Sequence, residues 1–190
     1  MIPKNLLIFD FDGVLCNSIN ECLITSYNAY NFINGNISSN VYHLEKIPSK
    51  AKKYFLKFRP IAITAKDYYF IWNCYFNARA IDIHLPVNKQ EKIDSKLLAK
   101  YAQLFYELRK KWMEVDMDGW LKNNIFYPEI VSCLMKLPKE HNSIILSAKD
   151  NSSIKSLIKS EGLKFDNSQI LGSKSGRNKI GILKNFFSNN

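Results

Sequence analysis

Two aspartates one residue apart, Asp10 and Asp12, are the side chains of this sequence that most clearly suggest chemistry. They follow the apolar run Leu6-Leu7-Ile8-Phe9, and Gly13 comes directly after them. Carboxylates this close repel each other unless a positive charge lies between them, and a divalent cation bound through oxygen would supply it. A bare Asp-x-Asp pattern is more often an acidic turn after a strand. The apolar run in front of this one favours a metal-assisted site.

The apolar run predicts a strand that is buried on both faces, as in a parallel α/β sheet. Open α/β sheets bind ligands at the carboxyl ends of their strands, which is where Asp10 and Asp12 stand. Gly13 allows the chain to turn sharply after them. We therefore expect both carboxylates at the ligand-binding edge of a parallel sheet.

The segment Phe9–Leu15, FDFDGVL, resembles the first motif of the haloacid dehalogenase-like hydrolases, most of which are phosphatases. The resemblance implies that Asp10 is the nucleophile and Asp12 the general acid and base. Dehalogenases of this family usually lack the second acid, because they have no phosphate leaving group to protonate. Asp12 therefore indicates phosphoryl chemistry on a small phosphorylated substrate.

Two further residues match later motifs of the same family. Ser147 follows a second expected strand, residues 143–146, and stands where the second motif has Ser or Thr, whose hydroxyl and backbone amide contact a phosphate oxygen. Lys179 opens the last expected helix and matches the third-motif lysine, which neutralises phosphate charge. Lys174 is an alternative for that role. A serine after a strand is otherwise a turn residue, and most lysines are solvated surface groups.

The resemblance implies a two-step displacement with Mg²⁺ as the cofactor. Asp10 would attack phosphorus and form an aspartyl-phosphate. Asp12 would protonate the leaving alcohol and then take a proton from the hydrolytic water. The Asp10 carboxylate and the Asp12 backbone carbonyl would bind the metal. Two alternatives stay open: a catalytically impaired member that binds a phosphorylated ligand or a partner protein, and a phosphomutase, which uses the same acids.

The elements that position these residues fall into two groups. Residues 18–123 show helical patterns and no convincing strand, whereas residues 124–190 alternate helix and strand, which implies a parallel sheet. We expect an α/β fold with a Rossmann-like core (residues 1–17 and 124–190) and an all-helical cap (residues 18–123). The phosphoglycolate phosphatase and β-phosphoglucomutase branches of the family have such a cap, which closes over the site and selects the substrate.

Helix signals place four helices in the cap. Capping residues precede three of them, and a fourth ends at a proline. The expected helices begin just after Ser18, at about Ser49, after Thr64 and after Asp94. The third carries an aromatic run that we expect in the core rather than as a base-stacking platform.

The family's fourth motif, one or two acids after a further strand, has no counterpart in this sequence. No Asp or Glu follows Asp166, and eleven residues follow Lys179. The C-terminal strands of the family's sheet are thus expected to be missing, which leaves Leu6–Phe9 at an unpaired edge and favours oligomerisation. A truncated sequence, a partner that completes the sheet and a loss of catalysis would each explain the departure.

Composition limits the other classes of function. The 46% hydrophobic content excludes a disordered chain. The net charge of +10 is spread along the sequence. The basic residues form tight groups only at Lys52-Lys53 and Arg109-Lys110-Lys111, and we expect both groups on solvated helix faces. Nucleic acid is therefore not the expected partner.

No apolar run approaches the ~20 residues that span a bilayer. An immediate N-terminal strand leaves no room for a secretory signal, and four scattered cysteines indicate a reducing, cytoplasmic location.

Overall fold

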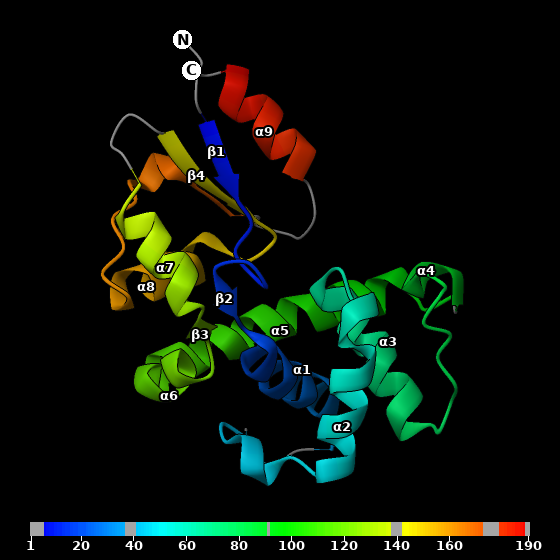
Figure 1. Cartoon of the computed structure of the whole chain (residues 1–190). Coiled ribbons are helices and arrows are strands. Elements are labelled where there is room, and N and C mark those ends of the chain that lie inside the picture. Colours follow the sequence, from blue (N-terminus) through cyan, green and yellow to red (C-terminus); the bar gives the residue numbers. More distant parts are fainter. Residues whose placement is uncertain (1–5, 37–40, 91, 138–141, 173–178, 189–190) are drawn as a thin grey trace. The chain divides into compact units, whose positions relative to one another are not determined.

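A computed structural model describes most of the chain: residues 6–36, 41–90, 92–137, 142–172 and 179–188 (Figure 1). The chain forms two compact units. The core unit combines Met1–Ser18 with Asn124–Asn190, and the helical unit is Ile19–Asn123. No helix among the described residues is both long enough and apolar enough to cross a membrane.

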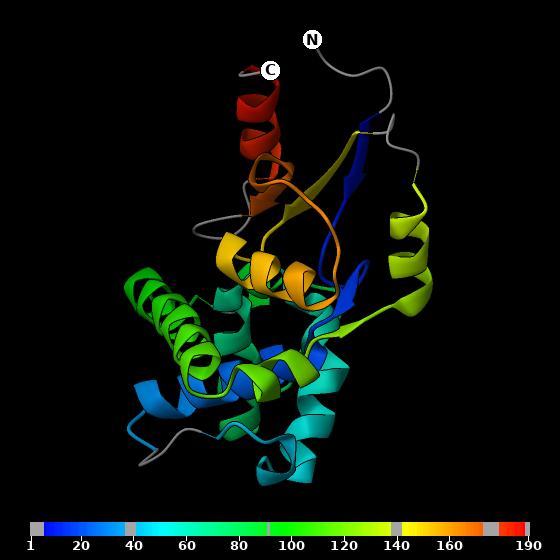
Figure 2. The same ribbon diagram turned by 90° about the vertical axis from the view of Figure 1, so that its left-hand side faces the viewer.

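The core unit contains a parallel sheet of three strands in the order β1-β4-β5, and the fold is α/β. The strands are β1 (Leu6–Phe9), β4 (Asn142–Ser147) and β5 (Ile170–Gly172). Phe9 pairs with Ile145, which in turn pairs with Ile170, so the carboxyl ends of the strands lie at one edge (Figure 2).

Three helices accompany this sheet: α7 (Pro128–Met135), α8 (Asn151–Ser160) and α9 (Lys179–Ser188). In Figure 1, α7 and α8 lie on one side of the strands and α9 lies on the other. Asp150 forms the N-cap of α8, and Gly162 follows its end with a φ of +67°. This layered arrangement follows from the alternation of helix and strand in the sequence.

The expected strand at residues 6–9 is present, but its expected burial on both faces is wrong. Leu7 is 36% exposed and Ile8 is 44% exposed. The physical reason is the position of β1, which is an edge strand in the described part of the chain and pairs with β4 alone. The expectation that this strand lies at a sheet edge agrees with the strand order.

The exposed edge leads to a prediction about self-association. We expect the chain to associate through β1 at high concentration, because an edge strand with apolar side chains can pair with another chain. Ile8→Lys should shift the chain toward monomer in size-exclusion chromatography with light scattering. Ile180→Lys is the matched control, since Ile180 is 73% exposed but lies on α9. An unchanged oligomer in Ile8→Lys would contradict this role of β1.

A short antiparallel ladder, which the sequence did not predict, lies where the chain leaves and re-enters the core unit. It pairs β2 (Cys16–Asn17) with β3 (Ile125–Phe126), and Cys16 lies opposite Phe126. The Tyr127 amide donates to the Leu15 carbonyl at 3.1 Å. The two ends of the helical insertion are thereby joined by backbone hydrogen bonds.

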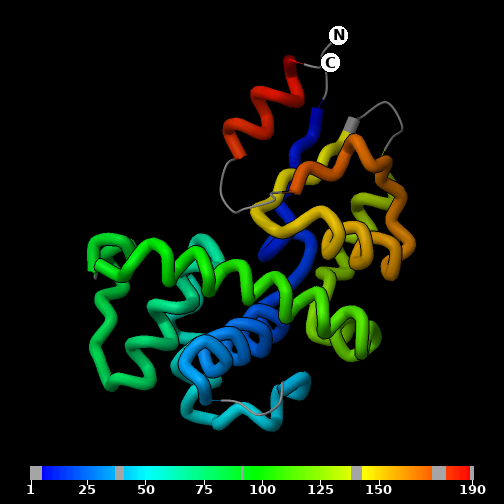
Figure 3. The backbone as a smooth tube through the Cα atoms, turned by 180° about the vertical axis from the view of Figure 1, so that it is seen from behind, coloured from blue at the N-terminus to red at the C-terminus, as the bar shows by residue number. Residues whose placement is uncertain are grey.

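In its described residues, the helical unit contains the four predicted helices and two shorter ones (Figure 3). The predicted helices are α1 (Ile19–Ile33), α2 (Ser49–Phe58), α3 (Ala65–Phe76) and α5 (Ser95–Val115). The additional helices are α4 (Val87–Gln90) and α6 (Met117–Lys122), too short to show a clear periodicity. Among the described residues, 3₁₀ turns occur at Leu44–Lys46, Arg59–Ile61 and Asn167–Gln169.

The aromatic run of α3 lies in the core of the helical unit, as expected. Trp72 is fully buried and stacks on Phe55 with ring centroids 5.3 Å apart. Its indole N–H donates to Ser26 Oγ at 2.9 Å, and the Tyr101 hydroxyl donates to the Ser26 carbonyl at 3.0 Å. Burial raises the pKa of Tyr101 well above its usual value, so the hydroxyl keeps the proton that it donates.

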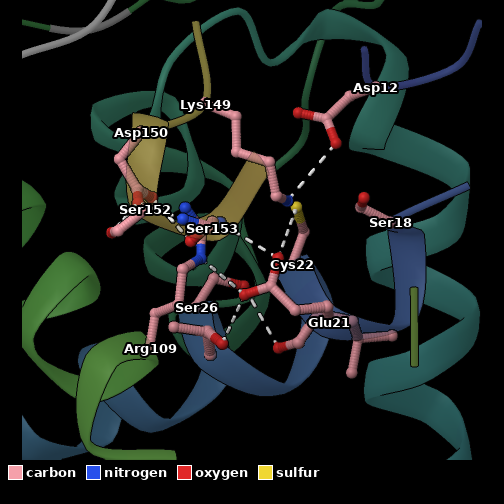
Figure 4. A network of polar contacts seen from close by, with 12 residues as sticks. Asp12, Ser18, Glu21, Cys22, Ser26, Arg109, Lys149, Asp150, Ser152 and Ser153 are labelled. Carbon is pink, nitrogen blue, oxygen red and sulfur yellow. Dashed lines mark hydrogen bonds and ion pairs between the residues drawn. The ribbon is translucent and has the colours of Figure 1, made fainter. Parts of the chain in front are cut away.

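A buried ion pair joins α1 to α5 (Figure 4). Arg109 Nε lies 2.8 Å from Glu21 Oε1 and Arg109 Nη2 lies 3.0 Å from Oε2, and both side chains are at least 95% buried. Thr25 Oγ1 also donates to Glu21 Oε1, at 2.9 Å. The expectation that Arg109 lies on a solvated helix face is therefore wrong, because a carboxylate from another helix compensates its charge.

Candidate active site

Asp10 lies directly after β1 and contacts the first residue of α9. Lys179 Nζ is 2.7 Å from Asp10 Oδ2, and the backbone amide of Phe11 donates to Asp10 Oδ1 at 2.8 Å. The Asp10 side chain is 44% exposed and that of Lys179 is 32% exposed. The structure thus brings together the two residues predicted to act as nucleophile and phosphate-binding cation, and leaves both accessible to solvent.

Asp12 lies in a tight loop that is anchored by the preceding residue. Phe11 is fully buried and contacts Phe126 edge-on, with centroids 5.7 Å apart. The Phe11 carbonyl accepts hydrogen bonds from the amides of Leu15 and Cys16, and Gly13 adopts a φ of +83°. Only glycine adopts this conformation without strain, so the turn that presents Asp12 depends on it.

A second cation, Lys149, contacts Asp12 (Figure 4). Lys149 Nζ is 3.3 Å from Asp12 Oδ1, and the lysine side chain is 1% exposed while that of Asp12 is 30% exposed. Lys149 is not among the site residues predicted from the sequence. Lys149 follows the end of β4 by two residues, and β4 is the strand next to β1. A lysine at the carboxyl end of the neighbouring strand was the signal that could have identified it.

Ser147 is the last residue of β4 and is 1% exposed. Its Oγ accepts a hydrogen bond from the Lys149 amide at 3.1 Å. Asp150 follows, and its carboxylate accepts from the amide and the hydroxyl of Ser153 at 2.8 and 2.9 Å. The predicted serine therefore shapes the loop that carries Lys149. Lys174, the alternative cation, lies outside the described residues.

The expected metal ligands are the Asp10 carboxylate and the Asp12 backbone carbonyl. The described residues contain no group of three or more His, Cys, Asp or Glu side chains that could hold a metal. Mg²⁺ is commonly bound by one or two carboxylates together with waters and substrate phosphate oxygens. The oxygen donors of Asp10 and Asp12 fit such a partly hydrated ion.

Comparison with known proteins gives matches among solved structures only. No protein-family model and no curated protein matches the sequence. The structure resembles a haloacid dehalogenase-like family hydrolase from Streptococcus pneumoniae, with a TM-score of 0.51 and 15% identity over 97% of this chain and 69% of that one. It also resembles a protein from Lactobacillus plantarum assigned as a phosphoglycolate phosphatase, with a TM-score of 0.52 and 15% identity over 99% of this chain and 72% of the other.

These matches show the fold. The α/β architecture of this chain, a parallel sheet with an inserted helical unit, is similar to that of these two solved proteins. At 15% identity the likeness concerns architecture, and the chemistry has to be argued from the residues of this chain.

Proposed function

We propose that this chain is a Mg²⁺-dependent phosphatase that hydrolyses a small phosphorylated metabolite through an aspartyl-phosphate on Asp10. The observation that carries the proposal is the Asp10–Lys179 pair at 2.7 Å, located at the carboxyl end of β1 and two residues before Asp12. The fold shared with haloacid dehalogenase-like hydrolases supports the same reaction class.

The first step is the attack of an Asp10 oxygen on phosphorus. Like charges ~4 Å apart repel by about 4 kcal/mol at an effective dielectric constant near 20, so a carboxylate approaches a phosphate dianion only if cations compensate. Lys179 lies close enough to Asp10 to bind a phosphoryl oxygen beside it. The new bond joins Asp10 to phosphorus, the ester P–O bond breaks, and the leaving oxygen takes a proton from Asp12.

The second step regenerates the enzyme. Asp12, now ionised, takes a proton from a water molecule, whose oxygen attacks the phosphorus of the aspartyl-phosphate. The P–O bond to Asp10 breaks, inorganic phosphate leaves, and Asp12 is again protonated for the next substrate. Asp10 and Asp12 would hold Mg²⁺, which supplies positive charge for the phosphoryl oxygens when bound.

A role in binding without turnover is the second candidate, and one observation favours it. The described residues contain no group of three or more His, Cys, Asp or Glu side chains that could add a further carboxylate to the Asp10 carboxylate and the Asp12 backbone carbonyl. We expect weak Mg²⁺ binding as a result, and calorimetric titration measures it. Tight binding together with turnover would exclude the binding-only candidate.

Hydrolysis of general phosphate esters tests the proposal. We expect phosphate release that requires Mg²⁺ and stops when EDTA removes it. Asp12→Asn should lower the rate with an alkyl phosphate by about 10²–10⁴-fold, because protonation of the leaving group contributes that much. Phosphate release that continues unchanged in EDTA, or a wild-type rate in Asp12→Asn, would overturn the mechanism.

A further inference from the structure

We propose that Lys149 is a positioning residue that fixes the Asp12 carboxyl group for proton transfer to the leaving group. The inference rests on the proposed function and adds a residue outside the motifs that the sequence resemblance supplies. It is carried by the distance of 3.3 Å between Lys149 Nζ and Asp12 Oδ1 and by the contrast in burial, 1% exposure for Lys149 against 30% for Asp12.

Burial restricts the position of the Lys149 ammonium group. A charged amine inside a protein is costly unless a carboxylate or other acceptors compensate it, and its side chain has little rotamer freedom there. Asp12 is more exposed and would otherwise sample several rotamers. An ion pair to a buried partner therefore restrains the Asp12 carboxylate more strongly than a pair to a surface lysine would.

The backbone of Lys149 is held from both sides of its loop. Ser147 Oγ accepts from the Lys149 amide at 3.1 Å, and the Gly172 amide donates to Asn151 Oδ1 at 2.5 Å. A Cβ at Gly172 would lie 2.6 Å from the Lys149 carbonyl oxygen, which is too close for any real side chain. The absence of a side chain at Gly172 therefore lets β5 pack directly against the loop that carries Lys149.

Lys149 holds one oxygen of the Asp12 carboxyl group and leaves the other for the proton. Lys149 Nζ lies 3.3 Å from Asp12 Oδ1, so Oδ2 is the oxygen that carries the proton. When the ester P–O bond breaks, the bonding electron pair goes to the leaving oxygen, and the proton on Asp12 Oδ2 moves to that oxygen. The contribution of Lys149 is thus the orientation of the donor oxygen.

Leaving groups of different basicity separate this role from a structural one. An alkyl phosphate needs a proton on its leaving oxygen, whereas nitrophenyl phosphate releases a stable phenolate and depends little on Asp12. Rapid-quench measurement of the first turnover reports this step for both esters. We expect Lys149→Met to lower the ratio of alkyl to nitrophenyl rates by about 10- to 100-fold, a part of the ~10²–10⁴-fold supplied by general acid catalysis.

Three further variants complete the experiment. Lys149→Arg keeps the positive charge and should retain a ratio closer to wild type. Gly172→Ala keeps Lys149 but displaces its loop, so it should lower the ratio and provides the test if Lys149→Met does not fold. Lys155→Met, at an exposed position of α8, should leave the ratio unchanged.

Equal losses with both esters in Lys149→Met and Gly172→Ala would overturn the positioning role while leaving the proposed function intact. Absence of hydrolysis by the wild-type chain with either ester would instead overturn the proposed function itself, and the role of Lys149 with it.

Discussion

Asp10→Asn should abolish phosphate release, by at least about 10³-fold, and should leave no covalent phosphoenzyme. An amide oxygen is a poor nucleophile toward phosphorus, and loss of a nucleophile in comparable enzymes removes nearly all of the chemical acceleration. Mass spectrometry of acid-quenched samples detects the aspartyl-phosphate in the wild-type chain and locates it on Asp10. The same substitution should leave the fold intact, because Asp10 is 44% exposed and pairs with a partly exposed lysine.

Asp118→Asn is the matched control for Asp10→Asn. Asp118 is exposed on α6 in the helical unit, and its substitution changes the net charge by the same amount. Its rate should equal that of the wild type. A wild-type rate in Asp10→Asn, or a phosphoenzyme on another residue, would remove Asp10 from the mechanism.

Arg109→Met should destabilise the helical unit by about 3–5 kcal/mol, the usual cost of breaking a buried ion pair from one side. The substitution leaves the Glu21 carboxylate, which has no exposed surface, without its main compensating charge. Total stabilities of small domains are only about 5–15 kcal/mol, so this loss is a large fraction of the total. Urea denaturation followed by tryptophan fluorescence measures it, because all three tryptophans, Trp72, Trp112 and Trp120, belong to the helical unit.

The double variant Glu21→Met/Arg109→Met separates the two possible causes of that loss. If the unpaired charge is the cause, the double variant should be more stable than Arg109→Met alone, since apolar replacements of a buried pair are often neutral. Lys110→Met is the control, because Lys110 is 80% exposed and its pair with Glu114 is long, at 3.8 Å. A double variant less stable than Arg109→Met would show that packing, rather than charge, sets the cost.

Local signals in the sequence predicted most of the elements. Thr64 and Asp67 form the capping box that starts α3, and Asp94 accepts hydrogen bonds from the amides of Lys96 and Leu97 at the start of α5. Such caps involve residues two or three positions apart, so they can be read from the sequence directly. The apolar runs of β1 and β4 were equally clear, and the run of β1 placed Asp10 directly after a strand, where the structure has it.

The features that the sequence did not reveal depend on partners distant along the chain. Lys149 pairs with Asp12 across 137 residues, and Arg109 pairs with Glu21 across 88. Lysine and arginine are rarely buried, so without the partner in view Arg109 was assigned to a solvated face and Lys149 was not singled out. The exposure of Ile8 has the same origin, because the burial of a strand is decided by its neighbours and not by its own apolar side chains.

The ladder between β2 and β3 makes the insertion a module that can be exchanged. Asn17 and Ile125 are cross-strand partners in an antiparallel pair, so the entry and exit of the insertion are only one interstrand spacing apart. A two-residue turn between them would close the same ladder as a β-hairpin. The core sheet therefore does not need this particular insertion for its own connectivity, and helical segments of very different length and surface can be accommodated there without moving Asp10 or Asp12. If Asp10 and Asp12 react as proposed, replacement of this one continuous segment would change the surface near the site and leave the reacting groups in place.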